Sequence, residues 1–289
     1  MCLRRVPADT FSIMVSRWAC GRCDFVAWTR DRSEMAEVTG SHLLAHHSDA
    51  LSKSDFRVSW DCPYCATAKT AYDTDGAVAE FKSHLHDHVA DRIADGVHVA
   101  DQMGWDGVVR VDAPPTGGEA DALRSHFHGA AGLVVAVTPT PERLVRTLDE
   151  RLASWPRRTV IVSTGEYDFE ATPDVDFEDL DVEIVELDPR LSPDEVGETV
   201  SRILDANHES GERVSLEVSV FHQIVAAFDV ERAVAFVRML AARLDDAGGV
   251  LQLYVDADAD RNVATVLNFL DETIDLTVAV DDGRFVRRP

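Results

Sequence analysis

Lysine is almost absent from this chain: its 289 residues include three lysines, against 25 arginines and 52 acidic residues, and the formal net charge is −24. Long apolar runs are absent as well, because no stretch approaches the ~20 residues that a membrane span needs. Residues 1–15 lack the apolar core of roughly 7–15 residues that marks a secretory signal peptide. We therefore expect a cytoplasmic protein without a membrane partner.

The scarcity of lysine combined with an acid excess is typical of proteins from a salt-loaded cytoplasm, where dense carboxylates keep chains soluble. The composition therefore predicts a halophilic archaeal source. It also disfavours non-specific binding to nucleic acid, which depends on basic patches and weakens steeply with salt. With 45% hydrophobic residues the chain can bury an ordinary core, and its length favours two domains over one.

Cysteine is scarce too, but four of the five cysteines form two Cys-x-x-Cys pairs. In a chain without a secretory signal, this spacing indicates a metal or redox site rather than a disulfide framework. An internal repeat favours the metal, because five residues recur in the same order 42 positions later. The repeated residues are Trp18, Cys20, Cys23, His42 and His46, which recur as Trp60, Cys62, Cys65, His84 and His88.

Each repeat contains the ligands of a tetrahedral zinc site. Two cysteines three positions apart place both thiolates on one side of a metal, and two histidines four apart lie on one face of a helix. The two cysteines and two histidines of each repeat are therefore the predicted ligands of one Zn²⁺, which gives two Zn²⁺ per chain. His47 can replace His46 in this pattern and His86 is a spare in the second repeat, so the fourth ligand of each site stays open.

The repeats resemble two-Cys/two-His zinc fingers with a longer spacing. About 12 residues separate the second cysteine from the first histidine in the DNA-reading finger, whereas both repeats have 18. We predict a first module over 15–51 with its helix over 33–47, and a second over 57–94 with its helix over 76–93. The polar residues offered by these helices are Ser33, Glu34, Glu37, Thr39 and Ser41, and Glu80, Lys82 and Asp87.

Charge is unevenly distributed between the two parts of the chain. Residues 1–104 carry 11 cations against 15 acids, and residues 105–289 carry 17 against 37. The modules are therefore much less acidic than the rest, although they form no basic patch. Nucleic-acid binding and a structural or protein-docking role both stay open for them.

From residue 105 onward, short apolar runs alternate with helical patterns, which predicts an α/β domain over 105–289. Strands separated by helices indicate a mostly parallel sheet with helices on both faces. The predicted strands are Gly107–Val111, Leu133–Thr138, Thr159–Ser163, Val182–Leu187, Val214–Val220, Val250–Val255 and Leu276–Val280. The predicted helices are Gly118–Phe127, Pro141–Ser154, Pro193–Asn207, Val230–Asp246 and Asn262–Leu270.

This domain resembles the RecA/KaiC-like ATPase domain, specifically the degenerate KaiC-like domains of haloarchaea, from about Val108 to Asp282. The resemblance rests on the segments Leu133–Leu152, Val214–Leu244 and Val266–Gly283. It implies a phosphate-binding loop after the first strand, an acidic residue for Mg²⁺ on a later strand, and a place in signalling or gene regulation. It also implies that the chain can form a homo-oligomer.

The residues at the implied phosphate-loop position do not suit that chemistry. A working loop reads G-x-x-x-x-G-K-[ST], in which the lysine pairs with phosphate oxygens and the hydroxyl holds Mg²⁺. Gly118 is retained, but Ala113 replaces the first glycine, Glu119 the lysine and Ala120 the hydroxyl residue. Glu119 would place a negative charge against a polyphosphate. Glu217 stands where the resemblance places the Mg²⁺ carboxylate.

Two acidic segments are better explained as loops than as sites. Residues 168–181 are predicted to be an exposed loop. Residues 256–260 look like the start of a Ca²⁺ loop, but the glycine and glutamate that such a loop needs are missing. No serine or cysteine lies in a nucleophile-elbow context, so no catalytic triad is predicted.

The sequence therefore predicts a non-catalytic regulatory or adaptor protein. Its tandem zinc modules would be joined to an inactive KaiC-like domain that serves as a platform for a protein partner. One alternative is a nucleic-acid-binding transcriptional regulator that uses the zinc modules. A second alternative is an ATPase with residual nucleotide binding.

Overall fold

The structure is a computed structural model, which describes residues 15–48, 51–54, 56–166, 180–187, 192–207, 211–256, 261–281 and 284–288. Most of the predicted acidic loop at 168–181 and of the Ca²⁺-like segment at 256–260 lies outside these residues. The described chain forms two compact units. The N-terminal unit combines residues 14–97 with 284–287, and the C-terminal unit spans residues 98–283.

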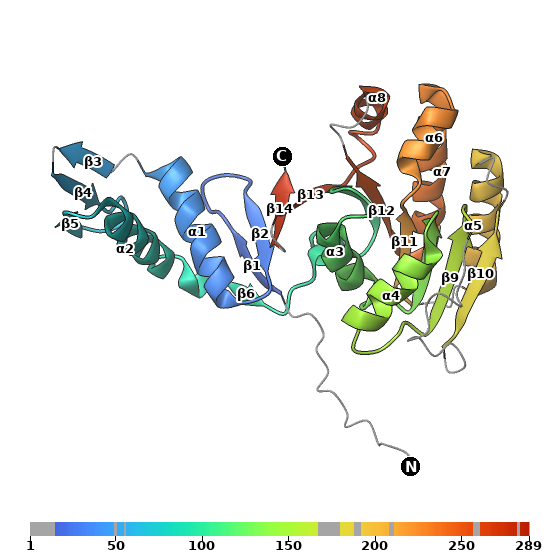
Figure 1. Cartoon of the computed structure of the whole chain (residues 1–289), viewed down its shortest axis with the longest axis horizontal. Helices are drawn as coiled ribbons and strands as arrows, with labels where there is room; N and C mark the ends of the chain where they lie inside the picture. The colour runs from blue at the N-terminus through green and yellow to red at the C-terminus, as the bar shows by residue number, and fades with distance from the viewer. Residues whose placement is uncertain are drawn as a thin grey trace, which may run out of the picture. The chain divides into compact units, whose positions relative to one another are not determined.

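Both predicted modules fold as short antiparallel strands followed by a helix, and both belong to the N-terminal unit (Figure 1). Their helices begin in the same way. Asp31 caps α1 by accepting backbone N–H groups, and Asp73, 42 residues later, caps α2. The elements are β1 Ser16–Ala19, β2 Val26–Thr29, α1 Arg32–His47, β3 Leu51–Ser54, β4 Arg57–Asp61, β5 Ala68–Ala71, α2 Thr74–Asp87, η1 Ala90–Arg92, β6 Ala94–Asp95 and β14 Arg284–Arg288.

Strand β14 is the unexpected member of this unit. It pairs antiparallel with β2, where Phe285 lies opposite Trp28, and this sheet has the order β14-β2-β1-β6. Our prediction placed all of 105–289 in the α/β domain. The structure instead assigns residues 284–287 to the N-terminal unit, because β14 pairs with β2 there.

The helices of the two modules pack directly against each other. Gly40 allows the close approach, since a Cβ at this position would lie 2.8 Å from the backbone oxygen of Lys82. Lys82 also pairs with Glu37 at 2.6 Å, and the Thr39 hydroxyl lies 2.8 Å from Nδ1 of His86. Three of the polar side chains that we predicted on the helix surfaces are therefore used between the helices. One shared hydrophobic core joins the modules, with Trp18, Met35, Leu43, Trp60, Phe81 and Leu85 among its members.

The C-terminal unit is built on a parallel sheet with the order β10-β9-β8-β11-β12-β7-β13. The predicted α/β class is confirmed. Its elements are η2 Val99–Met103, β7 Gly107–Asp112, α3 Gly118–His128, β8 Leu133–Thr138, α4 Pro141–Arg151, β9 Arg158–Ser163, β10 Val182–Glu186, α5 Pro193–Asn207, β11 Val214–Val218, α6 Phe221–Ala227, α7 Val230–Ala247, β12 Gly249–Val255, α8 Arg261–Phe269 and β13 Leu276–Asp281.

The two faces of this sheet differ in chemistry. Helices α5, α6, α7 and α8 cover one face, where alternate residues of β11 and β12 such as Leu216 and Leu253 join the main hydrophobic core (Figure 1). The other face carries α3 and α4, and most of the intervening residues of β11 and β12 there are polar, namely Ser215, Glu217, Gln252 and Tyr254. A parallel strand buried on both faces is normally apolar throughout. These buried polar positions therefore need partners.

Within the described part of the chain, no helix is long and apolar enough to cross a membrane.

Candidate metal centres and a buried ion-pair network

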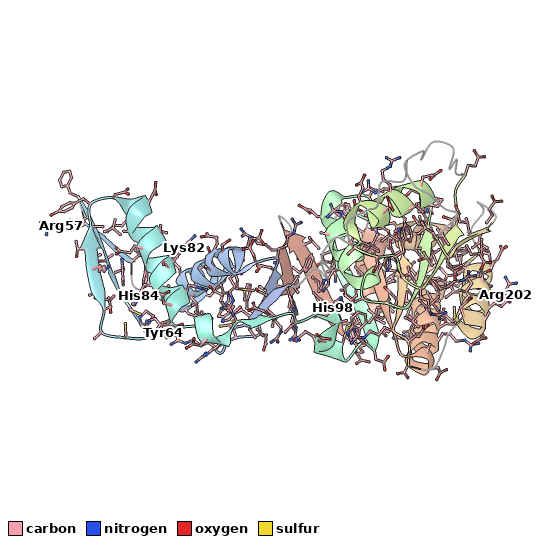
Figure 2. All side chains as sticks on the ribbon, turned by 90° about the horizontal axis from the view of Figure 1, so that it is seen from below. Arg57, Tyr64, Lys82, His84, His98 and Arg202 are labelled. Carbon is pink, nitrogen blue, oxygen red and sulfur yellow. The ribbon has the colours of Figure 1, made fainter. Side chains whose placement is uncertain are left out.

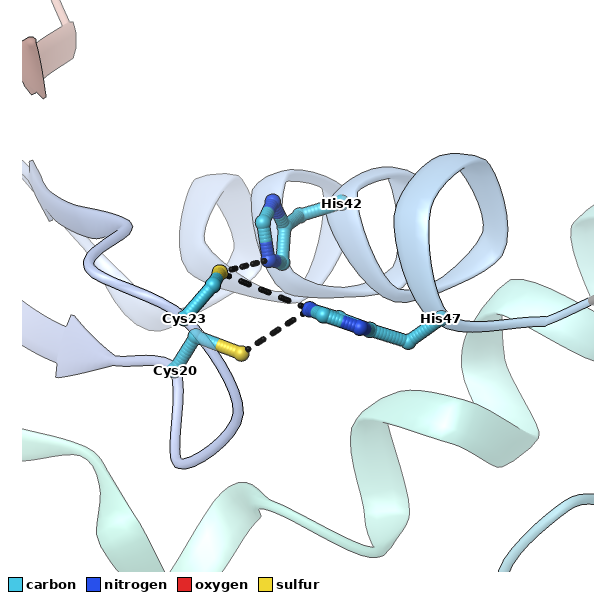
Figure 3. A group of neighbouring side chains, drawn as sticks. All are labelled: Cys20, Cys23, His42 and His47. Atoms are coloured by element: carbon cyan, nitrogen blue, oxygen red, sulfur yellow. Dashed lines mark hydrogen bonds between the residues drawn. The ribbon is translucent and has the colours of Figure 1, made fainter. Parts of the chain in front are cut away.

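The first two-Cys/two-His cluster consists of Cys20, Cys23, His42 and His47. The cysteines lie on the turn between β1 and β2, which the backbone N–H of Cys20 closes by donating to the carbonyl of Phe25 at 2.9 Å. The histidines come from the second half of α1 (Figure 3). All four potential ligand atoms lie within 4.8 Å of one another.

The distances within this cluster fit a zinc tetrahedron. His47 Nε2 lies 3.3 Å from Cys20 Sγ and 3.4 Å from Cys23 Sγ, and His42 Nε2 lies 3.4 Å from Cys23 Sγ. Bond lengths of about 2.3 Å for Zn–S and about 2.0–2.1 Å for Zn–N imply a sulfur–nitrogen edge of about 3.5 Å. The side chains are thus already arranged around a space of the right size for the ion.

His47, and not the predicted His46, is the fourth member of this cluster. His46 is exposed, whereas His47 is half-buried and approaches both sulfurs. Both histidines satisfy the spacing of three to five residues that separates such ligand pairs, so the orientation of the last helical turn decides between them. His47 is the last residue of α1, and from there its ring approaches both sulfurs.

The second cluster consists of Cys62, Cys65, His84 and His88, the four residues that the sequence predicted. Its turn repeats the first, because the backbone N–H of Cys62 donates to the carbonyl of Thr67 at 2.9 Å. Cys62 Sγ lies 3.4 Å from His88 Nε2, and Cys65 Sγ lies 3.4 Å from His84 Nε2. The spare histidine at 86 faces α1 instead, so it is no ligand here.

Metal binding needs thiolate and neutral imidazole, and the surroundings of Cys65 and His42 favour these protonation states. Hydrogen bonds with the side chain and the backbone of Thr67 lead the causes that lower the pKa of Cys65 to about 6. Burial, followed by the neighbouring histidines, lowers the pKa of His42 to about 4. Burial raises the pKa of the Cys20 and Cys62 thiols, so a bound cation would be needed to hold these two as thiolates.

A second constellation lies inside the C-terminal unit, between α3 and the polar face of the sheet. Glu217, on β11, is 1% exposed. Nε of Arg124 lies 2.8 Å from both of its carboxylate oxygens, and Nε2 of His128 lies 2.9 Å from one of them. The Ser219 hydroxyl is a further partner. Burial alone would raise the pKa of Glu217, but Arg124 and His128 hold that pKa well below its usual range.

Arg124 joins this carboxylate to the rest of the site. It pairs with Asp121, and Asp121 also accepts a hydrogen bond from Arg143 at 2.6 Å. Its Nη2 donates to the backbone carbonyl of Pro115 at 2.9 Å. Its guanidinium lies over the ring of Tyr254, 4.7 Å from the centroid. The buried charges are therefore paired, as burial of ions requires.

The polar residues of β11 and β12 continue the network behind His128. Tyr254 donates to Gln252 at 2.7 Å, the Gln252 amide donates to the Ser215 hydroxyl at 2.6 Å, and Ser215 lies 2.9 Å from His128 Nδ1. His128 therefore links the Ser215 hydroxyl, at Nδ1, to the Glu217 carboxylate, at Nε2. The contact order Ser215–His128–Glu217 is that of a hydrolase triad. Ser215 is fully buried, however, and cannot meet a substrate.

A cavity of about 300 Å³ opens beside this network, at the carboxyl ends of the strands. Residues after β8 and at the end of β11 line it, and the chain leaves these neighbouring strands in opposite directions. Such a switch point is where open parallel sheets bind ligands. Of the five residues predicted for the degenerate nucleotide site, Glu217 lines this cavity, and the other four are not among its lining residues. Glu119 is exposed, whereas Ala113 and Ala120 are buried.

Comparison with known proteins places most of the C-terminal unit in one family. Residues 108–278 match the model of a family of unknown function, DUF7504. The chain belongs to this family. No curated protein matches the sequence of this DUF7504 member.

Solved structures are similar to the chain only loosely. A structural-study target from Pyrococcus horikoshii OT3 is 13% identical with a TM-score of 0.39, covering 62% of this chain and 83% of its own. An uncharacterized Pyrococcus horikoshii protein, solved with an unknown peptide, is 14% identical with a TM-score of 0.38, covering 63% and 81%.

A pair of stacked histidines lies near the start of the C-terminal unit, outside the two metal clusters and the Glu217 network. The rings of His98 and His126 are 3.7 Å apart and nearly parallel. His126 accepts the backbone N–H of Val99 at 3.2 Å, and His98 Nε2 lies 2.9 Å from the His126 carbonyl. Burial lowers the pKa of His98 to about 4 and that of His126 well below its usual value.

This pair predicts that the C-terminal unit loses stability as the pH falls from about 6.5 toward about 4. In that window the unfolded chain binds protons that folded His98 and His126 do not, so the free energy of unfolding falls, by roughly 2–3 kcal/mol for His98 alone. Guanidinium unfolding followed at several pH values measures the slope. The double variant His98→Gln/His126→Gln should show a shallower slope than the natural chain. Equal slopes of unfolding free energy against pH in the two proteins would contradict the assignment of this effect to His98 and His126. Protonation of the metal-binding histidines affects both proteins alike, so it drops out of the comparison.

Proposed function

We propose that this chain is a non-catalytic regulatory or adaptor protein. In this proposal two Zn²⁺ ions hold the N-terminal unit, and the C-terminal unit is a degenerate relative of the RecA/KaiC-like ATPase domains that has lost its nucleotide chemistry. The C-terminal unit would serve as a platform for a protein partner in the cytoplasm.

The observation that carries the proposal is the pairing of Glu217. A carboxylate that holds Mg²⁺ during phosphoryl transfer must be free to face the metal. Both oxygens of Glu217 instead accept a hydrogen bond from Nε of Arg124 at 2.8 Å, and the Glu217 side chain is buried. A cation therefore already neutralises this carboxylate. Displacing Arg124 would leave its charge buried and unpaired, at a cost of several kcal/mol.

The loop that would hold phosphate supports the same conclusion. Pro114 and Pro115 have no backbone N–H to donate to a phosphate oxygen. Pro115 contributes a carbonyl oxygen instead, and this oxygen accepts a hydrogen bond from Arg124. The exposed side chain of Glu119 adds negative charge at the start of α3, where a phosphate would have to lie.

Zinc is the metal that suits the two clusters best. Each cluster offers two thiolates and two imidazoles, which is the ligand set of structural zinc, and hard cations such as Mg²⁺ prefer oxygen ligands. Four protein ligands leave no position open for a substrate, so a catalytic role is disfavoured. When bound, the ions would stabilise the fold of the N-terminal unit. Each ion would support the hydrophobic core that the two modules share.

We predict that the chain does not bind ATP·Mg²⁺. Replacement of an attractive lysine by Glu119 changes the sign of an interaction worth a few kcal/mol, so a micromolar site would weaken beyond about 1 mM. Calorimetric titration of the zinc-loaded protein, in molar and in dilute KCl, should show no saturable heat up to about 1 mM nucleotide. Saturation at tens of micromolar that Glu217→Ala abolishes would instead support the ATPase alternative.

A further inference from the structure

The N-terminal unit departs from the acidic character of the rest of the chain. Residues 14–97 together with 284–287 contain 11 cations and 13 acids, although the whole chain has a net charge of −24. All three lysines of the protein lie close together: Lys69 and Lys82 in module 2, and Lys53 on strand β3, which pairs with β4 of that module. Such charge asymmetry within one chain is a feature of proteins that meet an anionic partner.

Two of these lysines already form ion pairs within the unit, and the third, Lys53, forms none with the residues that the structure describes. Lys69 pairs with Glu80, and Lys82 pairs with Glu37. Lys53 instead lines an open groove together with Arg57, at the end of the β3-β4-β5 sheet that lies away from Tyr64 and His84 (Figure 2). No carboxylate is among the described residues that line this groove.

Two aromatic rings stand in the same groove and are exposed to an unusual degree. Phe56 is 82% exposed and Tyr72 is 77% exposed. The guanidinium of Arg57 lies over the Tyr72 ring, 5.5 Å from its centroid. The core of module 2 is filled without them, because Trp60 stacks on Phe81 at 4.6 Å. We call Lys53, Phe56, Arg57 and Tyr72 the module 2 tip.

The helices of the modules are poorly placed to read DNA in the manner of zinc fingers. That mode inserts a helix into the major groove and contacts bases with its exposed polar residues. Here Glu37, Thr39 and Lys82 contact the neighbouring helix, and Gly40 brings the two backbones together. An anionic partner would therefore have to use another surface of this unit.

We propose that the module 2 tip binds single-stranded nucleic acid. Bases would stack on Tyr72 and Phe56, and Lys53 and Arg57 would contact the phosphates between them. The groove has a volume of about 650 Å³, and both rings are among the residues that line it. Stacking of bases on aromatic rings flanked by cations is how non-sequence-specific single-strand proteins bind, and it leaves no role for a duplex groove.

This inference adds single-stranded nucleic acid as a partner of the proposed adaptor protein, and either proposal can fail without the other. The test uses the full-length, zinc-loaded chain and a labelled oligo(dT) or oligo(rU) of about 15 nucleotides, with a duplex of equal length and anionic lipid vesicles as competitors. Fluorescence anisotropy is recorded from about 0.1 M to about 2 M KCl, because phosphate contacts weaken with salt. If the chain carries two Zn²⁺ and still does not bind the oligonucleotide, the nucleic-acid proposal fails and the adaptor proposal is unaffected.

We expect the single strand to bind in preference to the duplex and to the vesicles. Tyr72→Ala and Phe56→Ala should each weaken binding by about tenfold or more, because each removes a stacking platform. The matched control is Phe269→Ala, which removes a ring that is 60% exposed in the C-terminal unit and should change nothing. The pair Lys53→Gln/Arg57→Gln should reduce the slope of log affinity against log salt by about 1.4. Arg232→Gln, at an exposed cation elsewhere, is its control.

Three results would overturn the proposal. One is no binding of either strand at about 0.1 M KCl, where phosphate contacts are strongest. A second is equal weakening by Phe269→Ala and Tyr72→Ala, and a third is preference for the duplex or the vesicles. Zinc content and unfolding midpoints show whether each variant is folded. Photo-crosslinking of the natural chain to the strand needs no variant, and it must map to the peptides that contain Phe56 and Tyr72.

Discussion

His47→Ala should release about one Zn²⁺ per chain to a chelator that leaves the natural protein loaded, whereas His46→Ala should release none. The two histidines are adjacent in sequence, but His47 Nε2 approaches both sulfurs of the first cluster and His46 is exposed. Structural zinc contributes roughly 10–16 kcal/mol of apparent binding free energy in small zinc modules. The loss of a ligand should therefore be the largest single effect on the N-terminal unit.

The shared core predicts how far this damage spreads. Residues of both modules pack in one hydrophobic cluster, so the loss of the first zinc should loosen module 2 as well. Elemental analysis gives the zinc content, and hydrogen exchange shows which amides lose protection. Amides of the parallel sheet should stay protected. If His46→Ala released the ion and His47→Ala did not, the sequence-based choice of His46 would be restored.

The metal clusters were largely predictable because their chemistry is local. Cysteines three apart, followed by histidines about one helical turn apart, limit which side chains can meet, and the repeat at 42 residues identified three ligands of the first cluster and all four of the second. The fourth ligand of the first cluster was not predictable in the same way. His46 and His47 both stand at the end of α1, and the choice depends on how the last turn meets Cys20 and Cys23.

The α/β class was predictable for a related reason, since each central strand is a short apolar run between helical segments. Strand β14 was not, because Arg284–Arg288 contains two apolar residues and its partner β2 lies more than 250 positions earlier. Only the folded chain brings these two strands together.

The buried network around Glu217 was harder to predict from the sequence. Ser215 and Glu217, like Gln252 and Tyr254, stand at alternate positions of strands that are otherwise apolar, which marks one polar face. That signal could have located the network, but it could not have named Arg124. The arginine precedes Glu217 by 93 positions, and its helix carries other polar residues that point to the same layer.

Arg124→Met should lower the free energy of unfolding of the C-terminal unit by about 3–5 kcal/mol, because it removes the arginine that pairs with the buried carboxylate of Glu217. Arg232→Met is the matched control, since its partner Asp229 is 3.9 Å away and both side chains are exposed. That change should stay within about 0.5 kcal/mol. Guanidinium unfolding at neutral pH gives both values.

The double variant Arg124→Met/Glu217→Leu decides whether the two charges act as a pair. Removing both leaves no unpaired charge, and replacing a buried ion pair by apolar residues is often neutral or stabilising. The double variant should therefore be more stable than Arg124→Met alone, although His128 then loses its acceptor. Asp121 keeps Arg143 as a partner. If the two substitutions cost as much together as the sum of each alone, Arg124 and Glu217 are not coupled, and the pairing that excludes Mg²⁺ from Glu217 loses its energetic basis.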